Sequence, residues 1–284
     1  MSSSSNFWFI FEWIELVRML SFSAFMDYKK ISIQLFSYLT SKLILGLTMV
    51  LLCMSTCSPI PPGIPGKQIP LKYQVSENDP QATPYLLYLP KDYDDDNRQW
   101  PLLVFLHGRG ERGSDINLVK THGPPKLIEQ GISFPFLVIS PQCPLIFPEW
   151  DWQLLDNLLT EVLKTYRIDC NRIYLTGLSM GGFGSWTWAM NRPERFAALV
   201  PICGWGDTSK VCSLKNIPIW TFHGAQDPVI PIQKTEDLVR ALKECGGNVN
   251  FTIYPEAKHD AWTETYDNQE LYRWILMQKN SVDE

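Results

Sequence analysis

The chain has 284 residues, of which 45% are hydrophobic and 19% are charged, so it can bury a full-sized core and does not have the composition of a disordered protein. Its 25 basic and 30 acidic residues give a formal net charge of -5, without the basic excess of a nucleic-acid-binding protein. None of the 7 cysteines is arranged as a C-x-x-C pair or has a companion H-x-x-x-H that would suggest a zinc site. We therefore expect no nucleic-acid partner and no structural metal.

Residues 1–66 differ in composition from the rest and are predicted to form an export leader and a linker. The apolar run at 43–54 has the length of the hydrophobic region of a signal peptide and falls short of the roughly 20 residues that cross a bilayer as a helix. Lysines precede it, and prolines and glycines between 61 and 66 suit a linker. We expect an exported protein that is secreted, periplasmic or membrane-anchored, with its functional domain at 67–284.

Three features of this leader stay open. Initiation at Met26 rather than Met1 would give a signal peptide of ordinary length. Cys57 stands in a sequence similar to a bacterial lipobox, whose cysteine carries a lipid, although Thr56 replaces the small residue that such boxes have there. An uncleaved membrane anchor is the third alternative, if the apolar run extends back to Ile31.

Beyond residue 67, short apolar runs alternate with longer amphipathic runs, which predicts an α/β fold: a mostly parallel sheet with helices on both faces. Strands are expected at 85–89, 102–106, 136–140, 173–176, 198–202, 217–222 and 250–254. Helices are expected at 152–166, 180–191, 233–245 and 269–278. The connection at 204–216 is short, so we expect no large lid domain and an open cleft.

The segment 171–184 places a G-x-S-x-G motif directly between a predicted strand and a predicted helix. A serine in such a turn, here Ser179, holds its hydroxyl above the sheet, and the backbone N–H of Met180 has no acceptor at the helix N-terminus. Glycine and serine are common, so the motif alone is weak, but the strand and helix around it are the context it requires. Ser179 is therefore the predicted nucleophile, and a helix-capping serine is the alternative.

A serine hydroxyl becomes a good nucleophile when a neighbouring imidazole takes its proton. Two histidines follow Ser179 in the chain. His223 ends a predicted strand, whereas His259 lies in a loop after the last predicted strand, where it can lean over the sheet edge toward the serine. His259 is the predicted base, with a surface-loop histidine as the alternative.

The base needs a carboxylate to fix its tautomer and stabilise its charged form. Asp227 lies on the loop after the strand at 217–222, which is the place expected for this acid. Asp207, on the loop one strand earlier, and Asp260, beside the base, are the two alternatives. Among these three aspartates, we expect replacement of the catalytic acid to cause the largest loss of activity.

The glycine-rich loop 106–113 follows an early strand and can aim a backbone N–H at a developing oxyanion. We assign that N–H to Arg109, which acts together with the N–H of Met180. The loop matches neither of the common glycine-rich nucleotide-binding motifs, which argues against a phosphate site.

These motifs together resemble the α/β-hydrolase superfamily, and more narrowly its phospholipase/carboxylesterase and dienelactone-hydrolase-like branch, which includes secreted esterases labelled predicted peptidases. The resemblance rests on Leu106-His107-Gly108-x-Gly110, Gly177-Leu178-Ser179-Met180-Gly181-Gly182, His223-Gly224-x-x-Asp227 and Tyr254-Pro255-x-x-x-His259. It covers about residues 70–280 and implies ester or thioester hydrolysis through an acyl-enzyme on Ser179, with no cofactor. Arg109 stands where thioesterases of this group usually carry an apolar residue, which argues against a long lipid acyl substrate.

Four tryptophans fall near the predicted carboxyl ends of strands, where open α/β sheets bind ligands. They are Trp150, Trp152, Trp205 and Trp262, and we expect them to line the cleft, with plain core packing as the alternative. An exported enzyme with an aromatic cleft suggests small or carbohydrate-linked acyl or aryl esters, free or on a polysaccharide. A serine peptidase of the prolyl-oligopeptidase type and a non-catalytic binding protein of the same fold remain as alternatives.

Cys203 and Cys212 flank the loop that follows the strand at 198–202. In an oxidising compartment a disulfide between them would stiffen this loop. The alternative is that all the cysteines are reduced and buried.

Overall fold

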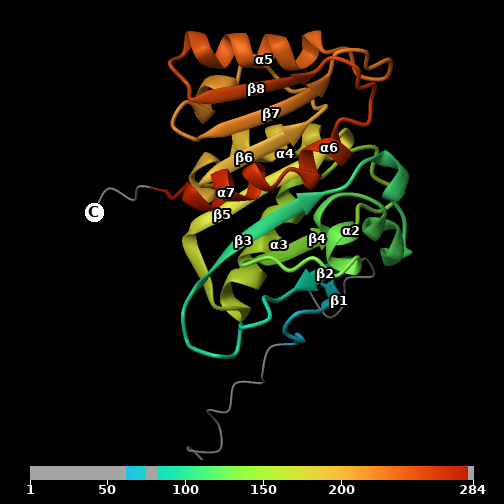
Figure 1. Cartoon of the computed structure of the whole chain (residues 1–284), viewed down its shortest axis with the longest axis vertical. Coiled ribbons are helices and arrows are strands. Elements are labelled where there is room, and N and C mark those ends of the chain that lie inside the picture. The colour runs from blue at the N-terminus through green and yellow to red at the C-terminus, as the bar shows by residue number, and fades with distance from the viewer. Residues whose placement is uncertain (1–61, 75–81, 281–284) are drawn as a thin grey trace, which may run out of the picture. The chain divides into compact units, whose positions relative to one another are not determined.

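The computed structural model of the chain describes residues 62–74 and 82–280 (Figure 1). The predicted signal peptide, the two candidate start sites and the lipobox-like cysteine Cys57 all lie outside these residues. Within the described ranges, no helix combines the length and apolar character needed to cross a membrane.

Among the residues described, eight strands form one sheet in the order β1-β2-β4-β3-β5-β6-β7-β8 (Figure 1). The strands are β1 (Gln68–Tyr73), β2 (Thr83–Tyr88), β3 (Trp100–Leu106), β4 (Leu137–Pro141), β5 (Ile168–Leu178), β6 (Ala198–Ile202), β7 (Ile219–Gly224) and β8 (Val249–Tyr254). β1 and β2 run antiparallel to their neighbours, whereas the pairs from β4 to β8 are parallel. The predicted mostly parallel sheet is therefore confirmed.

Helices cover both faces of this sheet. The α-helices are α2 (Gly123–Glu129), α3 (Trp152–Thr165), α4 (Met180–Asn191), α5 (Gln233–Glu244), α6 (Trp262–Asp267) and α7 (Gln269–Met277). Along β3, Leu102 and Val104 pack with apolar residues of α3, α4 and α5, and the alternate residues Leu103 and Phe105 pack with those of α2, α6 and α7. This alternation follows from the two-residue period of a strand and makes one core on each face.

The predicted elements agree with the structure to within two residues at each end, except that β5 begins at Ile168 rather than at Ile173, and β1, α2 and α6 were not predicted. β1 contains Pro70 and is only partly buried, because it is an edge strand, so it lacks a clear apolar run. α2 begins with Gly123, Pro124 and Pro125, and α6 has 6 residues, so neither shows a full helical period. The connection between β6 and β7 contains only the short 3-10 helix η4 (Val211–Leu214), as expected for a fold without a large lid.

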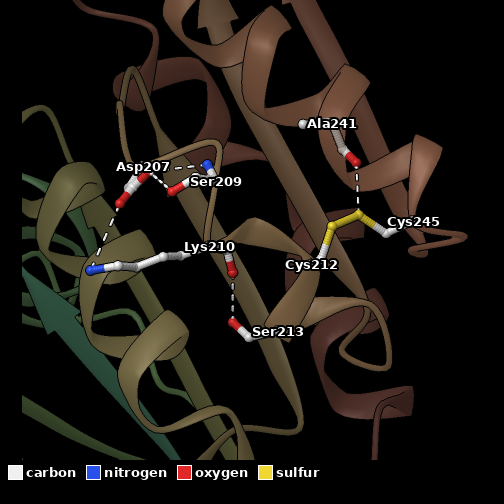
Figure 2. The surroundings of a disulfide bond; sticks show 7 residues. All are labelled: Asp207, Ser209, Lys210, Cys212, Ser213, Ala241 and Cys245. Atoms are coloured by element: carbon white, nitrogen blue, oxygen red, sulfur yellow. Dashed lines mark hydrogen bonds and ion pairs between the residues drawn. A yellow bond between two sulfur atoms is a disulfide. The ribbon is translucent and has the colours of Figure 1, made fainter.

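The Cys203–Cys212 disulfide is not formed, and the alternative that all cysteines are reduced and buried is also wrong. Cys212, in η4, instead bonds Cys245 at the end of α5 (Figure 2). Cys203 is buried at the end of β6, with its Sγ atom 3.3 Å from the backbone oxygen of His259. The two cysteines that are close in sequence therefore face different elements, and α5 supplies a partner 33 residues away that spacing alone does not reveal.

Replacing both Cys212 and Cys245 with serine is expected to lower the free energy of unfolding by about 3–4 kcal/mol, because the bond closes a loop with a sequence separation of 33. Urea unfolding of the oxidised proteins measures this difference. Serine at Cys170, an exposed free cysteine, is the matched control and should change stability little. Equal stabilities of oxidised wild type and double variant would contradict a bond at this site.

Candidate active site

Ser179 lies in a sharp turn between β5 and α4. Its backbone has φ 54° and ψ -115°, a conformation that residues other than glycine rarely adopt. The turn brings backbone so close that a Cβ on Gly181 would lie 1.9 Å from the Leu106 carbonyl oxygen, and a Cβ on Gly177 2.3 Å from that of Gly181. The two glycines of the motif therefore permit the turn that presents the serine hydroxyl at the carboxyl end of the sheet.

The structure brings the three predicted catalytic side chains into one hydrogen-bonded chain. Nε2 of His259 lies 2.9 Å from Oγ of Ser179, and Nδ1 of His259 lies 2.7 Å from Oδ2 of Asp227. The carboxylate can only accept, so Nδ1 carries the hydrogen and Nε2 is left to accept the hydrogen of the serine hydroxyl. These distances suit proton transfer from Ser179 to His259.

Asp227 is held ionised in the interior. Its side chain is 0% exposed, and its Oδ1 accepts the backbone N–H groups of Val229 and Ile230 at 2.8 and 3.0 Å. Burial by itself raises the pKa of Asp227, but the hydrogen bonds from His259, Ile230 and Val229 lower that pKa overall. The carboxylate therefore keeps its charge at neutral pH and fixes the orientation of the imidazole.

The two alternative acids lie elsewhere. Asp207 is exposed and accepts the N–H and hydroxyl of Ser209, with Lys210 3.7 Å away (Figure 2). Asp260 accepts the backbone N–H and the hydroxyl of Thr263 in the first turn of α6. Each carboxylate thus stabilises its own turn, whereas Asp227 contacts His259.

The predicted oxyanion donors, the N–H groups of Arg109 and Met180, both belong to residues that line the cleft. Arg109 is the first residue of the 3-10 helix η1 (Arg109–Glu111), and Met180 is the first residue of α4. The first N–H groups of a helix have no acceptor within that helix, so both are available to an anion.

His107 fixes the loop that carries Arg109. Its ring is 1% exposed, with Nδ1 2.6 Å from the Gly108 carbonyl oxygen, and Nε2 accepts the backbone N–H of Cys143. Burial lowers the pKa of His107 to about 4, so the ring is neutral and links β3 to the segment after β4. His107 is therefore structural.

A cleft of about 310 Å³ opens above Ser179. Its lining includes Trp205, stacked on Phe183 with ring centroids 4.8 Å apart, and Trp262, whose ring meets that of His259 edge to face. The other two predicted tryptophans do not line the cleft. Trp150 is 7% exposed and donates Nε1–H to the His107 carbonyl oxygen, and Trp152 packs against the core beneath α3.

Sequence reasoning missed several lining residues, which are Glu111, His122, Pro148, Glu149, Val229 and Ile230. Glu111 is the last residue of η1, and its Oε1 is 3.7 Å from Nε2 of His122. They come from three loops far apart in the sequence, and no local spacing joins them. The only sign of them in the sequence was that some of these residues lie in the predicted oxyanion loop or directly after the predicted acid Asp227.

Cys203, His223 and Asp227 form the group of possible metal ligands in the described part of the chain, with their ligand atoms within 4.8 Å of one another. Burial raises the pKa of the Cys203 thiol to about 12, which keeps it protonated. Asp227 is already bonded to His259. These residues therefore suit internal hydrogen bonding better than metal binding.

The family model of phospholipases and carboxylesterases matches residues 151–271, a range that contains Ser179, Asp227 and His259. The crystal structure of a thermostable esterase is 38% identical, with a TM-score of 0.65, and the match covers 75% of this chain and 64% of that chain. The chain has the α/β-hydrolase fold and is similar to the phospholipase and carboxylesterase branch of that superfamily. The expected superfamily and fold are thereby confirmed.

Two curated relatives match this chain at lower sequence identity. A bifunctional acetylxylan esterase/xylanase of Neocallimastix patriciarum is 26% identical over 184 residues, which are 61% of this chain and 26% of that protein. A probable feruloyl esterase C of Aspergillus niger is 25% identical over 190 residues, which are 64% of this chain and 68% of that protein. The α/β-hydrolase therefore spans about a quarter of the length of the first of these relatives and about two thirds of the second.

Proposed function

We propose that the chain is a serine carboxylesterase that works through an acyl-enzyme on Ser179. The observation that carries this proposal is the continuous hydrogen-bonded path from Ser179 through His259 to Asp227 at the base of an open cleft. His259 accepts the serine proton as Oγ attacks the ester carbonyl carbon, and then gives that proton to the departing alcohol. Asp227 stays ionised and stabilises the imidazolium that forms in between.

The N–H groups of Arg109 and Met180 stabilise the negative oxygen of the tetrahedral intermediate. Each is the first N–H of a helix, and a charge that develops during reaction is stabilised best by donors that are already in place. Deacylation follows the same path: His259 removes a proton from water, the hydroxide attacks the acyl carbonyl, and Ser179 recovers its hydrogen as the acid leaves.

The substrates that we propose are small or carbohydrate-linked acyl and aryl esters. A volume of about 310 Å³ is at the small end of ligand sites and suits an acetyl or single-ring acyl group. Trp205 and Trp262 offer aromatic surfaces for stacking. Relatives named for acetylxylan and feruloyl ester hydrolysis support the same substrate class.

Export to an oxidising compartment is part of the proposal. The Cys212–Cys245 disulfide supports it, because disulfides persist in exported proteins and are rare in the reducing cytosol. The signal-peptide-like apolar run at 43–54 supports it independently. Detection of the processed chain outside the cytosol tests it, and retention of the full-length chain in the cytosol would contradict it.

A hydrolysis screen tests the proposed activity. The substrates are p-nitrophenyl esters of increasing acyl length, methyl ferulate and acetylated xylan, with p-nitroanilide amides as the comparison. Turnover of short or aromatic esters well above turnover of the amides supports the esterase. Faster turnover of amides would favour the peptidase alternative, and no turnover of any substrate would favour a binding protein.

The pH dependence of kcat/KM should rise through a single ionisation, because His259 must be neutral to accept the serine proton. Burial lowers the pKa of His107 to about 4 and also lowers the pKa of His223, while hydrogen bonds keep that of Asp227 low. These three groups keep their charge through the rise and do not cause it. Activity that is constant between pH 5 and 8, with chemistry limiting, would contradict a histidine base.

A further inference from the structure

A second imidazole, that of His223 at the end of β7, contacts the carboxylate of Asp227. Nε2 of His223 lies 3.2 Å from Oδ2 of Asp227 and 2.9 Å from the backbone oxygen of Ile230. The His223 side chain is 0% exposed, and the reaction above gives it no proton to carry. A buried imidazole is stable only when its nitrogens are hydrogen-bonded, so its partners indicate its role.

The partners of His223 fix which nitrogen carries the hydrogen. Both neighbours of Nε2 are acceptors, because a carbonyl oxygen has no hydrogen and Asp227 is ionised, so Nε2 must donate. On the opposite side of the ring, Nδ1 lies 2.8 Å from Oγ1 of Thr235, a buried residue of α5. Burial lowers the pKa of His223, so the ring is neutral, and with its hydrogen on Nε2 the Nδ1 atom has none to donate. The hydroxyl of Thr235 faces both this Nδ1 atom and the carbonyl oxygen of Gly204, which lies 2.9 Å from Oγ1.

We propose that His223 is a positioning residue for the catalytic acid, sharing its Nε2–H between the Ile230 carbonyl oxygen and Oδ2 of Asp227. Oδ2 then lies between the ring nitrogens of two imidazoles, at 3.2 Å from His223 and 2.7 Å from His259, while Oδ1 is held by backbone N–H groups. The carboxylate is thereby held in one orientation while the His259 ring gains and loses its proton. This role rests on the proposed serine mechanism and adds a residue that the triad itself does not contain.

The hydrogen from His223 also sets how strongly Asp227 attracts a protonated His259 ring. A carboxylate that loses one hydrogen-bond donor binds its remaining cationic partner more tightly. Removing the His223 donor should therefore move the acid limb, which is the rise of kcat/KM with increasing pH, to higher pH. Besides Asp227, the groups that face His223 are the protonated thiol of Cys203, the hydroxyl of Thr235 and His259 itself. Asp227 and His259 are the members of this set that carry charge during the reaction.

Two substitutions separate the hydrogen bond from packing. Glutamine in His223→Gln can place an amide N–H near the position of Nε2, whereas methionine in His223→Met has similar length and no donor. We expect the methionine variant to lose roughly 10- to 100-fold in kcat with little change in KM, and its acid limb to shift upward. The glutamine variant should recover most of both effects. In an Asp227→Asn background, the two variants should differ by less than about twofold.

If the two variants fold and have equal kcat values and equal acid limbs, the role of His223 is overturned. It is also overturned if their difference in kcat is as large in the Asp227→Asn background as in the wild-type background. If the methionine variant does not fold, nitrogen-15 NMR of histidine-labelled wild type decides. A hydrogen on Nε2 of His223 with Nδ1 bare supports the proposal, and the opposite tautomer overturns it.

Labelling of wild-type Ser179 by a fluorophosphonate tests the proposed function separately. No labelling overturns the function and this role together, whereas labelling together with equal kcat values in the two His223 variants overturns only the role.

Discussion

Replacing Ser179 with alanine will lower kcat for ester hydrolysis by about 10⁴- to 10⁶-fold. The residue supplies the oxygen that bonds to the acyl carbon, and no other part of the site can replace that bond. The loss of one hydroxyl at a partly exposed position removes little packing, so the fold should remain. Initial rates on a p-nitrophenyl ester, with circular dichroism to verify folding, measure the effect.

Covalent labelling is the control for this prediction. A fluorophosphonate reacts with an activated serine, so peptide mapping should find the label on Ser179 in wild type and no label in the alanine variant. Ser185 in α4 is a useful comparison, because its Oγ donates to the Gly181 carbonyl oxygen and is fully buried. Labelling of Ser185 or any other serine would remove Ser179 from the role of nucleophile.

Replacing Asp227 with asparagine will lower kcat by about 10⁴-fold, and replacing Asp207 with asparagine will change it by less than about threefold. The amide at position 227 loses the charge that stabilises the His259 imidazolium and can favour the wrong tautomer of that ring. Asp207 is exposed and bonded to its own turn, so its charge is screened by solvent and does not reach the base.

Steady-state kinetics of the two asparagine variants at the pH optimum of the wild type provide this comparison. The variants make the same chemical change on neighbouring strand-end loops, so a general effect of lost charge would appear in both. A larger loss at Asp207 would move the catalytic acid to the loop after β6 and contradict the path observed from Ser179 to Asp227.

The proposed triad could be predicted from sequence because each member occupies a position that local pattern defines. Ser179 stands between a strand and a helix, and Asp227 and His259 follow the strands β7 and β8. Parallel strands end at the same edge of a sheet, so residues that follow them converge without further information. The contact between His223 and Asp227 was not predicted, because the motif His223-Gly224-x-x-Asp227 places the two residues near each other in the chain without showing that their side chains meet.

The amino-acid sequence by itself determined the fold class, the positions along the chain of the strands after residue 83 and the strand-turn-helix arrangement at Ser179. These properties depend on apolar periodicity and on glycine, which act over a few residues. Only the tertiary structure decided which tryptophans reach the cleft, which cysteine pairs with Cys212 and what lies behind Asp227. Each of these depends on the packing of α5, α6 or the loop after β4 against distant strands, and contacts between segments far apart in the chain leave no periodic signal.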